Sequence, residues 1–175
     1  MTTDLSLAVQ VAVAGDKRAF DELVRRHQSP VRRFFLNQTL GDSQLSDDLA
    51  QDTFVKAYVN IKSFRALASF QTWLMRIAYN VFYDYTRSHR PTEDVERLPE
   101  RSRQENQTLR LDVYRALSLL KTDERTCITL QLIDGYDIRK VAEITGMKEG
   151  TVKSHLSRGK EKLANYLRKN GYDGR

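Results

Sequence analysis

A segment over residues 88–108 divides this 175-residue chain into two parts. The segment contains two prolines and many charged residues but almost no large apolar side chain. Such a segment buries too little apolar surface to offset the conformational entropy that is lost on ordering. We therefore expect two domains, residues 1–90 and 109–175, joined by a flexible linker over residues 91–108.

Both domains are expected to be all-α. The chain has only eight glycines and three prolines, and no run alternates apolar with polar residues as a half-buried strand does. Its single cysteine, Cys127, excludes an intramolecular disulfide, and one cysteine with three scattered histidines gives no metal-ligand spacing. We therefore expect neither a metal nor a cofactor.

The sequence carries no membrane signal. No apolar stretch approaches the roughly 18 residues that a membrane-spanning helix needs, and Asp4 stands where a signal peptide carries positive charge. We expect a cytoplasmic protein without membrane insertion. Its formal net charge of +6 favours a polyanion as the partner.

The first half of the chain predicts helices whose ends are marked by glycine, proline and short polar residues. Gly15 is expected to stop one helix and Asp16 to cap the next, and Pro30 is expected in the first turn of another. Ser46 is expected to cap a further helix, and the last one begins near Ser69. The predicted core stripe of this last helix consists of Phe70, Trp73, Leu74, Ile77 and Val81.

The second half predicts four helices. The first covers residues 109–120, and the second is expected to be capped by Thr122 and to stop at Gly135. A short helix over residues 138–145 and a longer one over about residues 150–168 follow, with Gly146 at the turn between them. Two helices joined by a tight turn that contains glycine predict a helix-turn-helix.

The longer helix of this pair is strongly basic, since residues 147–169 hold 7 basic residues against 2 acidic ones. Its apolar residues share one face, and the opposite face suits the major groove of DNA. A solvated amphipathic helix is the alternative. The candidate DNA-binding residues are Thr151, Lys153, Ser154, His155, Ser157, Arg158 and Lys162.

Residues 63–85 contain an unusual density of aromatic side chains. We assign Phe70 and Trp73 to the core, because they lie on the apolar stripe. The other aromatics stand among basic and amide groups, which suits single-stranded DNA with its exposed bases, and core packing is again the alternative. The candidate residues are Phe64, Arg65, Arg76, Asn80, Tyr83 and Arg87.

An acidic patch, formed by Asp47, Asp48, Gln51 and Asp52, stands out in this basic chain. Three interpretations are open: a solvated face near a helix N-terminus, a Mg²⁺ site, and a docking site for a basic protein partner. Sequence spacing alone does not separate them.

Three motifs follow one another along the chain. They read D-D-L-A-Q-D-T-F-V-K-A-Y, then S-F-Q-T-W-L-M-R-I-A-Y-N-V-F-Y-D-Y-T-R, then V-A-E-I-T-G-M-K-E-G-T-V-K-S-H-L-S-R-G-K-E-K-L. In order and spacing they resemble the extracytoplasmic-function (ECF) sigma factors of bacterial RNA polymerase, and the resemblance covers roughly residues 15–167.

This resemblance implies a sigma-2 domain, residues 1–90, and a sigma-4 domain, residues 109–175. Sigma-2 would dock on core RNA polymerase and melt the minus-10 promoter element, and sigma-4 would read the duplex minus-35 element. The resemblance places Asp48, Gln51 and Asp52 in the polymerase-binding segment, to which we add Asp47. It also implies an anti-sigma factor as a partner and no enzymatic activity of the chain itself.

The sequence departs from the family pattern at three places. Ala66 stands where a glycine commonly follows the basic residue of the loop. Arg139 and Lys140 occupy a segment that commonly has a glutamate, and His155 stands where an arginine is common.

Two other functions fit parts of the sequence. A free-standing helix-turn-helix repressor needs a dimerisation helix or a ligand pocket in the first half, and neither is evident. A metal-dependent nuclease could use Asp47, Asp48 and Asp52, but its carboxylates would have to converge from separate elements, whereas these lie within six consecutive residues.

Overall fold

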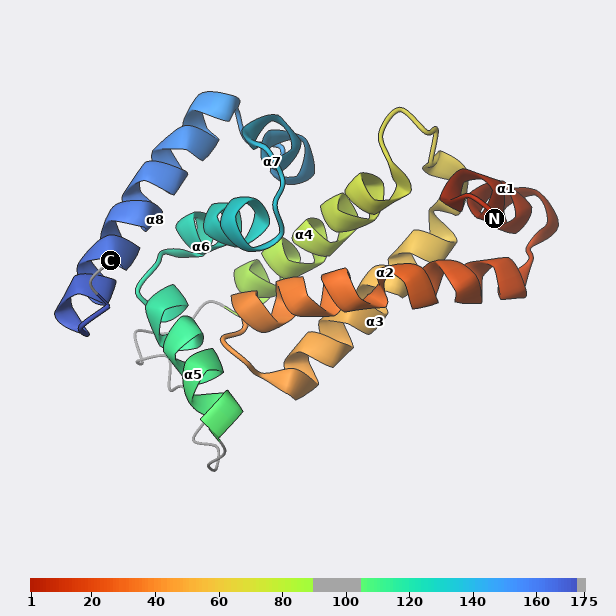
Figure 1. Ribbon diagram of the computed structural model, residues 1–175. Coiled ribbons are helices and arrows are strands. Elements are labelled where there is room, and N and C mark those ends of the chain that lie inside the picture. Colours follow the sequence, from red (N-terminus) through yellow and green to blue (C-terminus); the bar gives the residue numbers. More distant parts are fainter. Residues whose placement is uncertain (90–104, 173–175) are drawn as a thin grey trace. The chain divides into compact units, whose positions relative to one another are not determined.

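The computed structural model describes residues 1–89 and 105–172, and all regular secondary structure in these residues is helical (Figure 1). The expected all-α class is therefore confirmed. The chain forms two compact units, one built mainly from residues before position 90 and the other mainly from residues after it. Most of the predicted linker, residues 91–104, lies outside the described residues. Its last four residues, 105–108, are helical, so the helix predicted to begin at residue 109 begins at Glu105.

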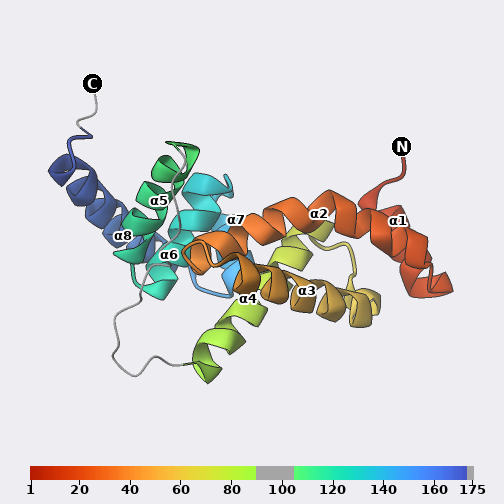
Figure 2. The same ribbon diagram turned by 90° about the horizontal axis from the view of Figure 1, so that it is seen from below.

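The first unit is a helical bundle. Its elements are α1 (Asp4–Ala14), α2 (Lys17–Gln38), α3 (Ser43–Val59), the short 3-10 turn η1 (Ile61–Ser63) and α4 (Phe70–Ser88). Helices α2 and α3 lie side by side in both views (Figures 1 and 2). The most deeply buried apolar side chains of this bundle are Leu23, Val31, Phe34, Phe35, Ala57, Leu74, Met75 and Ala78.

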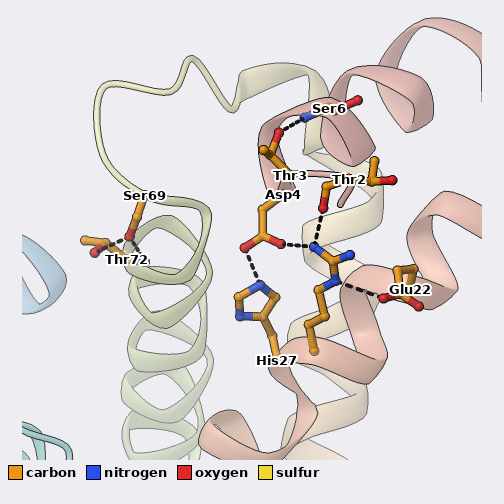
Figure 3. Close-up of polar contacts among 9 residues, drawn as sticks. Thr2, Thr3, Asp4, Ser6, Glu22, His27, Ser69 and Thr72 are labelled. Carbon is orange, nitrogen blue, oxygen red and sulfur yellow. Dashed lines mark hydrogen bonds and ion pairs between the residues drawn. The ribbon is translucent and has the colours of Figure 1, made fainter.

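Several predicted helix ends are confirmed. Gly15 closes α1 in the left-handed conformation at φ 64°. Asp16 then caps α2, because its Oδ1 accepts hydrogen bonds from the backbone N–H groups of Arg18 at 2.9 Å and Ala19 at 3.2 Å. Ser69 caps α4 in the same way, through a 3.1 Å hydrogen bond from the backbone N–H of Thr72 to its Oγ (Figure 3).

The predicted helix start at Pro30 is wrong, because α2 runs through this proline from Lys17 to Gln38. A proline inside a helix removes one backbone hydrogen bond and costs about 3 kcal/mol. Leu23, Val31 and Phe34 lie on the two sides of Pro30, and each is fully buried. Burying such side chains contributes about 1.5–3 kcal/mol each, so one continuous apolar face outweighs the local penalty.

Two predicted caps are also wrong. Helix α3 begins at Ser43, which places Ser46 inside its first turn with a fully buried side chain. Helix α6 begins at Thr122, so that Lys121 and not Thr122 is the cap residue. In both places a serine or threonine suits the first turn of the helix as well as its cap.

The second unit contains α5 (Glu105–Ser118), α6 (Thr122–Ile128), α7 (Ile138–Thr145) and α8 (Glu149–Lys169). A single π-helical turn, η2 (Thr129–Ile133), extends α6, and Gly135 ends it at φ 80°. Helix α6 packs against α8, and Ile128, Val152 and Leu156 are buried in this unit.

Candidate nucleic-acid and protein interfaces

The acidic patch lies on the exposed face of α3. Asp47, Asp48, Gln51 and Asp52 are all exposed, whereas Leu49, Thr53 and Ala57 on the other face are buried. Oδ1 of Asp47 accepts a 2.6 Å hydrogen bond from Nε of Arg32. Within residues 1–89 and 105–172, Asp48 and Asp52 have no ion pair, so two uncompensated carboxylates stand one helical turn apart.

The same face of α3 becomes apolar toward its C-terminal end. Val55 is 56% exposed and Val59 is 71% exposed. Among the described residues, no group of three or more His, Cys, Asp or Glu side chains could hold a metal ion. This face therefore combines negative charge with exposed apolar surface, a combination that is compatible with docking of a basic partner.

A short loop, residues 64–69, connects η1 to α4 and is held at its base by an aromatic cluster. The cluster consists of Phe64, Phe70 and Trp73, whose three ring centroids are each 5.4 Å apart. Phe64 is half-buried, so its ring serves the packing of the loop. Arg65 is exposed at the start of the loop.

Ala66 has a left-handed backbone conformation at φ 55°. A residue with a Cβ adopts this region at a cost of about 1–2 kcal/mol, which glycine does not incur. The glycine that is common in the resembled family therefore suits the conformation of this loop, and the present chain keeps the conformation with alanine.

The remaining candidates for contact with the minus-10 element lie on one exposed face of α4. Arg76, Asn80, Tyr83 and Arg87 follow each other at helical spacing, and all four are exposed. The guanidinium of Arg87 lies 5.8 Å from the centroid of the Tyr83 ring. On the predicted core stripe, Phe70, Leu74 and Val81 are buried, whereas Trp73 and Ile77 are only half-buried.

The helix-turn-helix pair is built by two local signals. Oδ1 of Asp137 caps α7 by accepting a 2.8 Å hydrogen bond from the backbone N–H of Lys140. Gly146 ends α7 at φ 73° and turns the chain into α8. These features are those predicted for a helix-turn-helix.

Helix α8 buries one face and exposes the other, as expected from its sequence. Val152, Leu156 and Gly159 are buried. His155 is half-buried, and its Nδ1 lies 3.5 Å from Nη2 of Arg158. The exposed candidates on α8 are Thr151, Lys153, Ser154, Ser157 and Arg158.

Lys162 is the candidate of α8 that is most closely paired within its own unit, since Arg158 approaches the same carboxylate only to 4.0 Å. Nζ of Lys162 donates a 2.7 Å hydrogen bond to Oε2 of Glu124, whose side chain is only 3% exposed. Burial acts to raise the pKa of Glu124, but the hydrogen bonds from Lys162 and from the backbone N–H of Lys121 outweigh it, and the net pKa is lowered.

Glu124 is a residue that the motifs do not reveal. Its only sequence signal is its position four residues before the buried Ile128, which places a charged side chain on the inner face of α6. A charged residue at such a position is almost always paired.

Comparisons with known proteins agree with this geometry. Residues 23–92 match the family model of Sigma-70 region 2, and residues 110–163 match that of Sigma-70 region 4. The ECF RNA polymerase sigma factor SigM of Mycobacterium tuberculosis is 36% identical over 160 residues, which cover 89% of this chain and 80% of SigM. The ECF RNA polymerase sigma-E factor of Haemophilus influenzae is 33% identical over 183 residues, covering 94% and 95% of the two chains.

Two solved structures have a similar fold. CnrH in complex with the cytosolic domain of CnrY matches with a TM-score of 0.71 and 30% identity, over 94% of this chain and 97% of the other. The sigma factor RpoE in complex with the anti-sigma factor NepR from Bartonella quintana matches with a TM-score of 0.74 and 26% identity, over 85% and 96%.

Both matched regions are those of sigma-70-type sigma factors, the promoter-specificity subunits of RNA polymerase. The chain belongs to the ECF sigma factors of RNA polymerase, and it directs transcription initiation through its sigma-2 and sigma-4 regions. None of the helices in residues 1–89 and 105–172 is long and apolar enough to span a membrane.

Proposed function

We propose that residues 1–90 act as sigma-2, residues 109–175 act as sigma-4, and residues 91–108 link them. The matches to region 2 and region 4 support this division. The protein works in the cytoplasm with core RNA polymerase. The nucleotidyl transfer itself belongs to the polymerase, so that the chain contributes binding and no catalytic group.

The acidic face of α3 docks on core polymerase. The observation that carries this assignment is the pair of exposed carboxylates, Asp48 and Asp52, on a helix of a net basic protein; neither has an ion pair with any residue that the structure describes. Gln51 lies between them, and Asp47 contributes while it is bound to Arg32. Opposite charge across an interface speeds encounter and fixes the register of docking.

The exposed face of α4 and the adjoining loop contact the minus-10 element as unpaired bases. Arg76, Asn80, Tyr83 and Arg87 supply cations, an amide and an aromatic ring on one face. Such groups stack on bases, bind their edges and neutralise phosphates. Arg65 extends this surface from the loop, and Phe64 holds the loop through its aromatic contacts.

The exposed face of α8 reads the minus-35 element in the major groove. Thr151, Lys153, Ser154, His155, Ser157 and Arg158 lie in its first three turns, where a recognition helix contacts bases and phosphates. Lys162 is left out of this set because it is bound to Glu124.

The protein is held inactive by an anti-sigma factor. Support comes from the solved relative RpoE, whose structure contains the anti-sigma factor NepR. Coexpression with candidate small proteins, followed by purification through this chain, tests whether a complex forms and whether it excludes core polymerase.

The docking assignment is tested by charge reversal. Asp48→Lys with Asp52→Lys should abolish copurification with core polymerase and run-off transcription, while surface substitutions of this kind leave folding intact. Asp21→Lys, an exposed aspartate on α2, is the matched control and should retain both activities. Full copurification of the double variant would overturn the assignment.

A further inference from the structure

Glu124 is a buried carboxylate that contacts α8 from the first turn of α6. Its Oε2 accepts hydrogen bonds from Nζ of Lys162 at 2.7 Å and from the backbone N–H of Lys121 at 3.0 Å. Its Oε1 lies 4.0 Å from Nε of Arg158. The carboxylate therefore faces two cations of α8 that are one helical turn apart.

Gly159 allows this close contact between the two helices. A Cβ at position 159 would lie 2.7 Å from Cγ1 of Ile128 and 3.8 Å from Cβ of Glu124. The absence of a side chain on α8 thus brings Arg158 and Lys162 within reach of the carboxylate on α6. The ion pair and the glycine act at the same crossing of α6 and α8.

Lys162 and Arg158 differ in how closely they are paired and in how far they are exposed. A buried carboxylate is stable only when its charge is paired, so Lys162 at 2.7 Å is required by Glu124. Arg158 is 59% exposed, and its guanidinium lies between Glu124 and Nδ1 of His155. Lys162 is 37% exposed but engaged by Glu124, whereas Arg158 keeps a more exposed guanidinium that is biased toward Glu124 and His155 by two longer contacts.

We propose that Glu124 is a positioning residue for reading of the minus-35 element. It keeps the ammonium of Lys162 away from the DNA backbone, and it fixes the part of α8 from which Arg158 contacts DNA. This proposal rests on the proposed function of α8 as the recognition helix. The pairing favours sequence-specific over non-specific binding, because a mobile lysine binds any phosphate whereas a fixed arginine binds in one geometry.

The test uses holoenzyme assembled from core polymerase and the full-length chain. The probes are a promoter duplex selected by the wild-type holoenzyme from a randomised library and the same duplex with a scrambled minus-35 element. Binding to both is measured over a range of KCl concentrations. The variants are Glu124→Gln, which keeps the shape of the side chain, and Glu124→Gln with Lys162→Met, which also removes the released cation.

Glu124→Gln releases Lys162 to bind phosphate. We expect tighter binding to the scrambled duplex and a slope of log K against log salt that is steeper by about 0.9, the value for one added phosphate contact. The ratio of the affinity for the selected duplex to the affinity for the scrambled duplex should fall by about tenfold. The double variant should return to the wild-type salt slope and keep the reduced ratio. Glu161→Gln, an exposed glutamate of α8, is the matched control and should change neither quantity.

Two results would overturn the proposal. One is an unchanged affinity of Glu124→Gln for both duplexes with an unchanged slope. The other is an equal loss of affinity for both duplexes with an unchanged slope, which would give Glu124 a purely structural role. Arg158→Ala and Ser154→Ala distinguish this failure from failure of the proposed function: if both variants leave the ratio unchanged, the proposed reading by α8 fails as well.

Discussion

Oδ2 of Asp4 lies 2.8 Å from Nε2 of His27, so the first turn of α1 is bound to a buried position in the middle of α2 (Figure 3). The other carboxylate oxygen of Asp4 accepts a 3.1 Å hydrogen bond from Nη1 of Arg26. The ring of His27 in turn lies 5.2 Å from that of Phe70 at the start of α4. Asp4 therefore connects α1 to the side of the bundle that carries the aromatic cluster.

Asp4→Ala should loosen α1 from the bundle. The substitution removes the partner of the buried His27 ring and one acceptor of Arg26, which keeps its hydrogen bonds to the Thr2 carbonyl and to Glu22. We expect Tm to fall by about 5 °C. Hydrogen exchange of the α1 amides should accelerate more than exchange in α4. Gln10→Ala, on the exposed side of α1, is the control. Equal exchange in the two variants would show that Asp4 does not hold α1.

Ala66→Gly and Ala68→Gly should have opposite effects, although both place glycine in the same loop. Ala66 is in the left-handed region at φ 55°, so glycine relieves strain there, whereas Ala68 has no positive φ. We expect the first variant to be as stable as the parent or up to about 1 kcal/mol more stable, and the second to lose about 0.5–1 kcal/mol. Chemical denaturation measures both. A loss of equal size in the two variants would contradict the left-handed conformation of Ala66.

Asn80→Ala should separate promoter melting from promoter binding. Asn80 is exposed on the face of α4 that is proposed to hold unpaired bases. Its loss should leave copurification with core polymerase unchanged and reduce permanganate reactivity of the minus-10 thymines, because the lost contact exists only with flipped bases. A promoter with a pre-melted bubble should partly restore transcription. Lys62→Ala, exposed in η1, serves as the control.

Gly159→Ala and Gly150→Ala form a matched pair on α8. A Cβ at position 159 would meet Cγ1 of the buried Ile128 at 2.7 Å, whereas a Cβ at position 150 has nothing within 4 Å. Alanine is a better helix former than glycine by about 1 kcal/mol, so Gly150→Ala should stabilise the protein. Gly159→Ala should destabilise it by about 1–3 kcal/mol, the usual cost of overpacking. Thermal unfolding measures both variants. Equal stability of Gly159→Ala and Gly150→Ala would contradict the close crossing of α6 and α8.

Cys127 should react only when the protein unfolds. Burial raises the pKa of its thiol from 9.0 to about 12, with a smaller contribution from Asp123, and the side chain is fully buried. At about pH 8, alkylation of the folded protein should therefore be slow and should follow the unfolding rate. Above about pH 9 the unfolded chain loses a thiol proton that the folded chain keeps, so stability should fall as pH rises. Cys127→Ala should lack this alkaline contribution.

Local signals in the sequence predicted much of the fold, because they act within a few residues of where they stand. Asp16, Ser69 and Gly146 are examples, since each satisfies or turns the backbone beside it. The continuous helix through Pro30 could not be read in this way. Its stability depends on the burial of Leu23 and Phe34 by side chains from other helices. The rule that proline breaks a helix considers only the local backbone and takes no account of that burial.

The candidate site shows the same difference between local features, which the sequence predicts, and contacts between distant residues, which it does not. Helical periodicity alone predicted which residues of α4 and α8 face outward, and the exposure of Asn80 and Ser154 agrees with it. The pairing of Lys162 with Glu124 joins residues 38 positions apart and requires the crossing of α6 with α8. The left-handed conformation of Ala66 is equally hidden, because an alanine at that place does not suggest it.

The aromatic cluster under the loop over residues 64–69 has a consequence for the temperature dependence of promoter opening. Phe64 is already packed on Phe70 and Trp73, and Ser69 already caps α4, before any DNA is bound. The loop is thus preorganised, and the entropy of ordering it is lost during folding instead of during capture of the minus-10 bases. If the cluster were weakened, the loop would become ordered only when the minus-10 bases are captured in the proposed function. The entropy loss would then oppose promoter opening, and this opening defect would grow as the temperature rises.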